Sequence, residues 1–113
     1  MKSLEEWVDK LKEVDKTIVV EGVKDKINLR KLGIPEKRII FLDGPLYQIA
    51  EKIYKREKDC ILLLDLDKEG KKLYSRLRHD LQRFGVKIDN KFREFLYKKT
   101  SMTYIEKIKL DKN

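Results

Sequence analysis

Short apolar runs alternate along the chain with longer segments in which apolar residues recur at helical spacing. The apolar runs predict strands at residues 17–20, 38–42, 60–64 and 86–88. The segments between them predict helices over residues 25–32, 46–57 and 69–84. This alternation is typical of an α/β protein with a parallel sheet and helices on both faces. Strand 60–64 is apolar throughout, which fits a sheet that is covered on both faces.

The order of these elements also predicts the topology of the sheet. Right-handed crossovers, with a reversal of winding after the first strand, give a four-stranded sheet in the order 2-1-3-4. The first and third strands are then neighbours. Ligands of open α/β sheets bind beyond the carboxyl ends of the strands, at the point where the winding reverses. We therefore expect functional residues where strands 17–20 and 60–64 end.

The chain has 113 residues, which suffices for one hydrophobic core. We expect a single domain over residues 1–113, with a core over about 16–90, an N-terminal helix over 4–14 and a C-terminal helical tail over 90–110. Ser3 and Glu6 form a capping-box pair at the start of the N-terminal helix.

Cysteine and histidine occur once each. This excludes a disulfide within the chain and a cysteine-rich zinc site, and it leaves little for a histidine metal site or a Ser-His-Asp triad. The longest apolar run, Cys60 to Leu64, is too short to cross a membrane, and no signal-peptide segment follows Met1. We expect a soluble, cytoplasmic protein with no membrane partner.

The positive charge is concentrated in one part of the chain. Residues 1–67 hold equal numbers of basic and acidic side chains. Residues 68–99 hold 11 basic and four acidic side chains, so they carry +7 of the net charge of +8. Such a one-sided basic region is typical of proteins that bind polyanions such as nucleic acids. The alternative is a solvated lysine-rich surface, of the kind that high growth temperature favours.

Three carboxylates follow the two strands that are expected to be neighbours. Glu21 comes directly after the first strand, and Asp65 and Asp67 follow the third. Residues two apart in a strand project to the same side, so both aspartates can face one site. Oxygen ligands without histidine or cysteine favour hard cations, which predicts Mg²⁺, or Mn²⁺, held by these three residues. Alternatively, Asp67 caps the helix that starts near Glu69.

These residues carry a resemblance to a known family. Residues 18–22 (IVVEG), followed by Asp25, resemble the first motif of the toprim domain, and residues 62–70 (LLLDLDKEG) resemble its second motif. Toprim is the catalytic domain shared by topoisomerases of types IA and II, bacterial primases, the 5S ribosomal RNA maturase and OLD-family nucleases. The resemblance covers about residues 16–90. The whole chain is similar to small stand-alone toprim proteins of archaea and some bacteria.

The resemblance implies a three-layer α/β/α, Rossmann-like fold and Mg²⁺-dependent phosphodiester chemistry. It implies that Glu21 acts as a general acid or base and sometimes as a metal ligand, and that Asp65 and Asp67 coordinate Mg²⁺. A glutamate close to a cation has a lowered pKa, which suits a base or a ligand better than an acid. The role of Glu21 therefore stays open at this point.

Two positions depart from patterns within the family. Val23 stands where many maturase-like sequences have lysine, with Lys24 next to it, and Lys71 stands where type IA topoisomerases often have glutamate. The first departure weakens a maturase assignment, and the second favours phosphate binding. We expect nucleic-acid contacts from five basic residues, namely Lys24, Lys68, Lys71, Lys72 and Arg76. The alternative for those in the long helix is a plain solvated face.

Three functions are compatible with these features. The first is a metal-dependent nuclease that acts on structured RNA, as the 5S maturase does. The second is a non-catalytic adaptor that binds nucleic acid or a ribonucleoprotein, and the third is a primase-like nucleotidyl transferase. RNA is favoured over DNA as the partner, but the sequence does not decide between the two. Substrate selection would come from a protein or ribonucleoprotein partner or from self-association. The sequence does not predict an oligomeric state.

Overall fold

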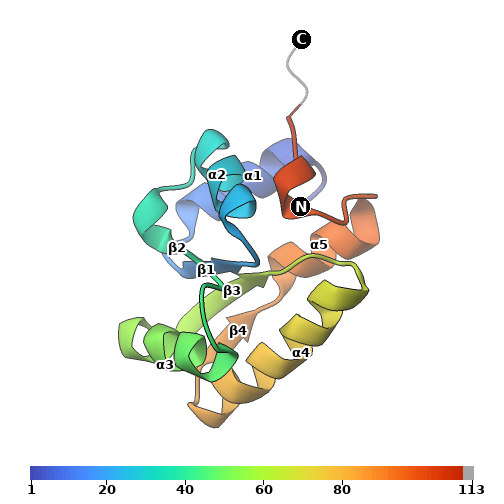
Figure 1. Ribbon diagram of the computed structural model, residues 1–113. Coiled ribbons are helices and arrows are strands. Elements are labelled where there is room, and N and C mark those ends of the chain that lie inside the picture. Colours follow the sequence, from blue (N-terminus) through green and yellow to red (C-terminus); the bar gives the residue numbers. More distant parts are fainter. Residues whose placement is uncertain (111–113) are drawn as a thin grey trace.

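A computed structural model describes residues 1–110 of the chain. It has a four-stranded sheet between two layers of helices (Figure 1), with the strands in the order β2-β1-β3-β4 and all paired in parallel. The strands are β1 (Thr17–Val20), β2 (Ile39–Phe41), β3 (Asp59–Leu63) and β4 (Lys87–Asp89). The predicted α/β class, strand order and three-layer fold are confirmed.

One face of the sheet is covered by elements from both halves of the chain. They are α1 (Leu4–Glu13), α2 (Val23–Lys31), α5 (Lys91–Lys99) and the 3₁₀ turn η2 (Ile105–Lys107). Trp7 of α1 is fully buried there in a T-shaped contact with the ring of Phe92 of α5, and its indole N–H donates a hydrogen bond of 2.9 Å to the Phe92 carbonyl. This bond satisfies a polar group that would be costly to bury alone.

The other face is covered by α3 (Leu46–Arg56) and α4 (Lys68–Arg83). Side chains alternate along β1, so that Ile18 and Val20 belong to the first layer of core and Val19 to the second. Both sets are buried, which explains why the strand is apolar at consecutive positions. A further 3₁₀ turn, η1 (Glu36–Arg38), leads into β2.

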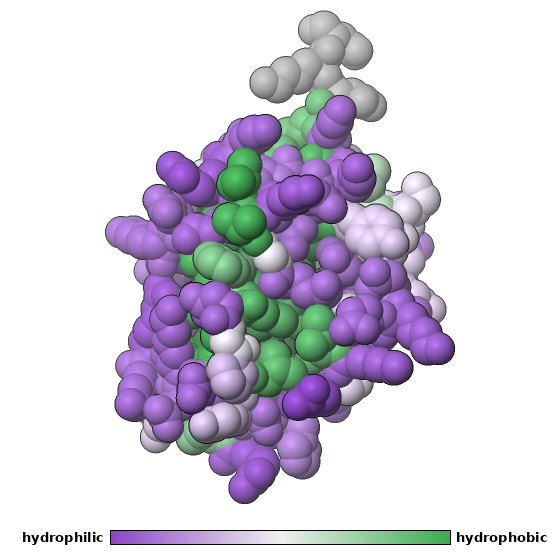
Figure 2. Space-filling view, viewed as in Figure 1, coloured by the Kyte–Doolittle hydropathy of each residue, from purple (hydrophilic) through white to green (hydrophobic). Residues whose placement is uncertain are grey.

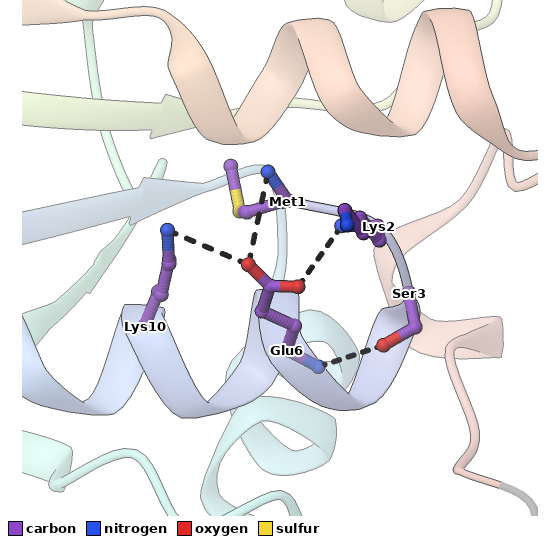
Figure 3. A network of polar contacts seen from close by, with 5 residues as sticks. All are labelled: Met1, Lys2, Ser3, Glu6 and Lys10. Atoms are coloured by element: carbon purple, nitrogen blue, oxygen red, sulfur yellow. Dashed lines mark hydrogen bonds and ion pairs between the residues drawn. The ribbon is translucent and has the colours of Figure 1, made fainter.

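The start of α1 shows how a local sequence signal is realised (Figure 3). The Ser3 hydroxyl accepts the Glu6 backbone N–H over 3.1 Å, as the predicted cap requires. The Glu6 carboxylate, however, accepts the N–H of Lys2 instead of that of Ser3. It also lies 3.5 Å from the Lys10 ammonium and 3.8 Å from the amino group of Met1.

The expected helical tail over 90–110 is only partly helical. After α5 the chain is extended at Thr100 and makes one 3₁₀ turn at η2. The physical reason is a set of contacts with distant parts of the chain. The carbonyl of Thr103 accepts the N–H of Leu66 over 2.8 Å, and Ile105 and Ile108 are buried in the first core layer. These contacts replace the hydrogen bonds of a continuous helix.

Polar residues cover most of the molecular face seen in Figure 2, and hydrophobic residues are exposed in its centre. Within residues 1–110, no helix is long and apolar enough to cross a membrane.

Candidate functional site

The ends of β1 and β3 bring Glu21 and Asp65 together. Val20 and Leu63 are partners in the parallel register of the two strands, so the residues that follow them leave the sheet side by side. The backbone N–H of Asp65 donates a hydrogen bond of 3.2 Å to Oε1 of Glu21. Two of the three predicted carboxylate residues are therefore in direct contact at the expected edge of the sheet.

Asp67 lies at the start of α4 and has a different local role. Its Oδ1 accepts the backbone N–H of Gly70 over 2.7 Å, which makes Asp67 the N-cap of the helix. This is the alternative that the sequence left open. The negative charge of Asp67 still raises the pKa of Glu21. Asp67 is thus a helix cap that remains electrostatically coupled to the other two carboxylates.

Gly70 permits the close approach of α4 to both strand ends. A Cβ atom at this position would overlap the backbone carbonyl of Asp65 and would lie 2.9 Å from Oε1 of Glu21. Any larger residue would push the helix away from the strand ends. The motif in residues 62–70 therefore requires glycine at its last position for a steric reason, because the start of α4 packs directly onto the site.

Burial and mutual repulsion shift the ionisation of these carboxyl groups. Burial raises the pKa of Glu21 to about 7, and the charge of Asp65 adds to the shift. Burial also raises the pKa of Asp65 to about 6, against the opposing effect of the Ile105 N–H, which donates to Oδ1 over 3.2 Å. The pKa of Asp25, which is 6% exposed, is raised by burial as well. The site thus concentrates negative charge in a partly desolvated position.

A pocket of about 330 Å³ opens beside Glu21. It is lined by Glu21, Gly22, Val23, Lys24, Asp25, Asp65 and Glu106. Lys24 is therefore the one predicted basic residue that lines this pocket. Asp25 closes the turn after β1, because its Oδ2 accepts the N–H of Gly22 over 2.9 Å.

Sequence reasoning placed Glu106 in the C-terminal tail but did not predict that this residue lines the site. Asn28 of α2 donates to the carbonyls of Ile105 and Ile108 over 2.8 and 2.9 Å, and this holds η2 beside the pocket. No local periodicity or motif connects Glu106 with Glu21, which lies 85 positions earlier in the chain. Only the tertiary fold brings the two residues to one pocket.

The other predicted basic residues lie along α4 and are exposed. Lys68, Lys72 and Arg76 follow each other at intervals of four, which places them in one row on the helix surface. Lys71 points to α5, where its ammonium lies 5.6 Å from the centre of the Tyr97 ring. The helix thus presents its positive charge on two sides.

The donor chemistry of the three carboxylates fits a hard cation. One oxygen of each carboxylate accepts a backbone N–H. Glu21 accepts the N–H of Asp65, Asp65 accepts that of Ile105, and Asp67 accepts that of Gly70. The second oxygen of each accepts no hydrogen bond from the described part of the chain. However, no group of three or more His, Cys, Asp or Glu side chains within residues 1–110 is arranged to hold a metal ion. A cation would therefore have to draw the carboxylates together.

The fold and site define a doubly wound α/β protein with an acidic centre at the carboxyl ends of its two middle strands. Residues 15–90 match the toprim domain family. A UPF0292 protein of Pyrococcus abyssi is 39% identical over 84% of this chain and 71% of its own length. A UPF0292 protein of Methanocaldococcus jannaschii is 34% identical over 92% of this chain and 91% of its own length.

A solved structure of a protein from Aquifex aeolicus is also similar. It superimposes with a TM-score of 0.87 at 32% identity, over 96% of this chain and the whole of that one. The chain belongs to the toprim domain family and, within it, to the UPF0292 proteins. Toprim is a family of nucleic-acid-related, metal-binding proteins.

Proposed function

We propose that this protein is a Mg²⁺-dependent phosphodiester enzyme, and specifically a nuclease that acts on structured RNA. The contact between Asp65 and Glu21 supports this most strongly, because it joins the two family motifs in one site. The pocket beside them combines these carboxylates with Lys24, so a phosphate group and a cation can be bound next to each other.

Glu21 is the residue that moves the proton in this proposal. In the metal-free protein the pKa of Glu21 is about 7, so the group both takes up and releases a proton near neutral pH. The N–H of Asp65 holds Oε1, so Oε2 is the atom that exchanges the proton with the reacting oxygen. A bound cation would lower this pKa and favour the role of base or ligand over that of acid.

Asp65 and Asp67, with Glu21 as a further ligand, would hold Mg²⁺, or Mn²⁺ in its place. When bound, the ion would stabilise charge on the phosphoryl group and activate water. Lys24, Lys68, Lys71, Lys72 and Arg76 would bind the phosphate backbone. A protein or ribonucleoprotein partner would select the RNA.

Two observations favour a second function, that of a non-catalytic nucleic-acid adaptor. The carboxylates of residues 1–110 are not arranged as a ready metal cluster, and the helix cap at Asp67 accounts for one of them without any chemistry. An adaptor would bind nucleic acid tightly, in a salt-sensitive way, and would not turn it over.

A cleavage assay separates these functions. Purified protein is incubated with end-labelled structured RNAs, including 5S precursor-like stems, and with DNA duplexes, with and without Mg²⁺ or Mn²⁺. Glu21→Gln and Asp65→Asn run beside wild type, and Asp43→Asn, an exposed carboxylate after β2, is the matched control. We expect metal-dependent cuts in wild type and in the control but in neither site variant. Salt-sensitive binding without cuts in any protein would favour the adaptor.

A further inference from the structure

A groove with basic and aromatic walls lies where α4 and α5 approach each other. The two helices pack on opposite faces of the sheet and are joined through the short edge strand β4. Two adjoining hollows of about 280 Å³ each form the groove, and both are lined by Tyr74, Arg93 and Tyr97. One hollow also reaches Leu66 and Lys71, and the other reaches Arg78 and Asn90.

Arg93 is a cation with unused hydrogen-bond donors. Its guanidinium lies 3.9 Å from the centre of the Tyr74 ring. Its Nε and Nη2 atoms are buried and donate to no group within residues 1–110. A guanidinium has five N–H donors and no acceptor, and leaving such donors unpaired in a buried place is costly. An anionic ligand with several oxygen acceptors, such as a phosphate, would accept hydrogen bonds from these donors.

The charge of the groove is not neutralised by neighbouring carboxylates. Lys71, Arg78 and Arg93 form no ion pair with any described residue. Glu94, which also lines the groove, lies 4.0 Å from the ammonium of Lys98. The groove therefore presents a net positive charge to a ligand.

Tyr97 adds an exposed aromatic ring to this charge. It is 63% exposed and lines both hollows, with the Lys71 ammonium 5.6 Å from the ring centre. The Tyr74 ring, by contrast, is covered by Arg93, and its hydroxyl donates to Oδ1 of Asn90 over 2.6 Å. Exposed aromatic rings beside cations bind unpaired bases by stacking while the cations contact the backbone.

The groove reaches the chain segment that carries the two aspartates, because Leu66, which stands between Asp65 and Asp67, lines the same hollow as Lys71. We propose that the α4–α5 groove binds a single-stranded segment of nucleic acid, with a base stacked on Tyr97 and a phosphate at Arg93. Base-paired duplex does not fit this description, since its bases are stacked on one another and its ring faces are covered. This inference rests on the proposed function for its class of ligand and narrows the substrate to one with unpaired nucleotides next to the site.

Fluorescence anisotropy with labelled oligonucleotides, in EDTA so that nothing is cut, tests the groove. The probes are a 12-nucleotide single-stranded RNA and a fully paired RNA of the same length. The variants are Tyr97→Ala, Tyr97→Phe and Arg93→Gln. Tyr47→Ala and Arg83→Gln are matched controls, because Tyr47 is 61% exposed on α3 and Arg83 is exposed at the end of α4. Thermal unfolding of each variant checks that it is folded.

We expect wild type to prefer the single strand, and Tyr97→Ala to weaken that binding about tenfold, while Tyr97→Phe binds nearly as wild type. Arg93→Gln should weaken it and reduce its salt dependence. Equal loss in Tyr47→Ala, unchanged binding in Tyr97→Ala, or a preference for the duplex would overturn the inference. If wild type cleaves RNA and Tyr97→Ala binds the single strand as wild type does, the groove is refuted and the nuclease is not. Groove-dependent binding without cleavage in any condition would refute the nuclease alone.

Discussion

The backbone N–H of Ile105 donates a hydrogen bond to the carboxylate of Asp65, 40 residues earlier in the chain. The segment after α5 therefore forms part of the site and is more than an appendage to the toprim core. It fixes one oxygen of a motif carboxylate and brings Glu106 to the wall of the pocket.

Asn28→Ala should loosen this segment. The variant loses two hydrogen bonds to the carbonyls of Ile105 and Ile108, and each bond contributes about 1 kcal/mol. We expect a decrease of about 1–2 kcal/mol in the free energy of unfolding in urea. We also expect a decrease in any cleavage activity, because the segment forms part of the pocket wall. Gln48→Ala, at an exposed position, is the control. Unchanged stability in Asn28→Ala would show that the apolar contacts alone hold the segment.

Gly70→Ala should disturb the site through the backbone. The added methyl group overlaps the Asp65 carbonyl and approaches Glu21, so α4 must move outward. We expect a loss of about 1–3 kcal/mol in the free energy of unfolding, as overpacking typically gives. Gly44→Ala is the matched control, since nothing lies within 4 Å of the new atom. A Gly70→Ala protein as stable as Gly44→Ala would contradict the steric account.

The stability of the metal-free protein should depend on pH through Glu21. Its folded pKa of about 7 lies above the ordinary value of 4.5, so the folded state binds more protons between these values. The contribution of Glu21 to stability is therefore full below pH 4.5 and falls as the pH rises to 7. Glu21→Gln should gain on the order of 1 kcal/mol over wild type at pH 8, after a discount for partial exposure, and little at pH 4.

Denaturant unfolding in EDTA at both pH values measures this difference, with Asp43→Asn as the control. If the difference in free energy of unfolding between Glu21→Gln and wild type is the same at pH 4 and pH 8, burial does not raise the pKa of Glu21.

Mg²⁺ should stabilise the folded protein if the carboxylates hold it. At a free concentration about ten times the Kd, a single site adds about 1.4 kcal/mol to the free energy of unfolding. We expect this gain in wild type and in Asp43→Asn and its absence in Asp65→Asn, measured by thermal or urea unfolding at pH 7.5. The same gain in all three proteins would indicate binding elsewhere on the surface.

The sequence predicted those parts of the site that depend on local structure. Glu21 and Asp65 end apolar strands, and the parallel topology brings such ends to one edge, so their meeting followed from the pattern. The role of Asp67 was open because a cap and a ligand have the same local sequence. The roles of Asn28, Ile105 and Glu106 at the site could not be found, because they join residues 40 to 85 positions apart without any repeating spacing.

The hydrogen bond between Trp7 and Phe92 has a consequence for how the protein is made. On a ribosome, the layer formed by α3 and α4 has all its partners once β4 has emerged, whereas the layer around Trp7 still lacks α5 and η2. The nascent chain therefore carries one finished and one open face of its sheet. Trp7 stays without its partner until Phe92 has been synthesised, and the open face is exposed to misassembly during this interval.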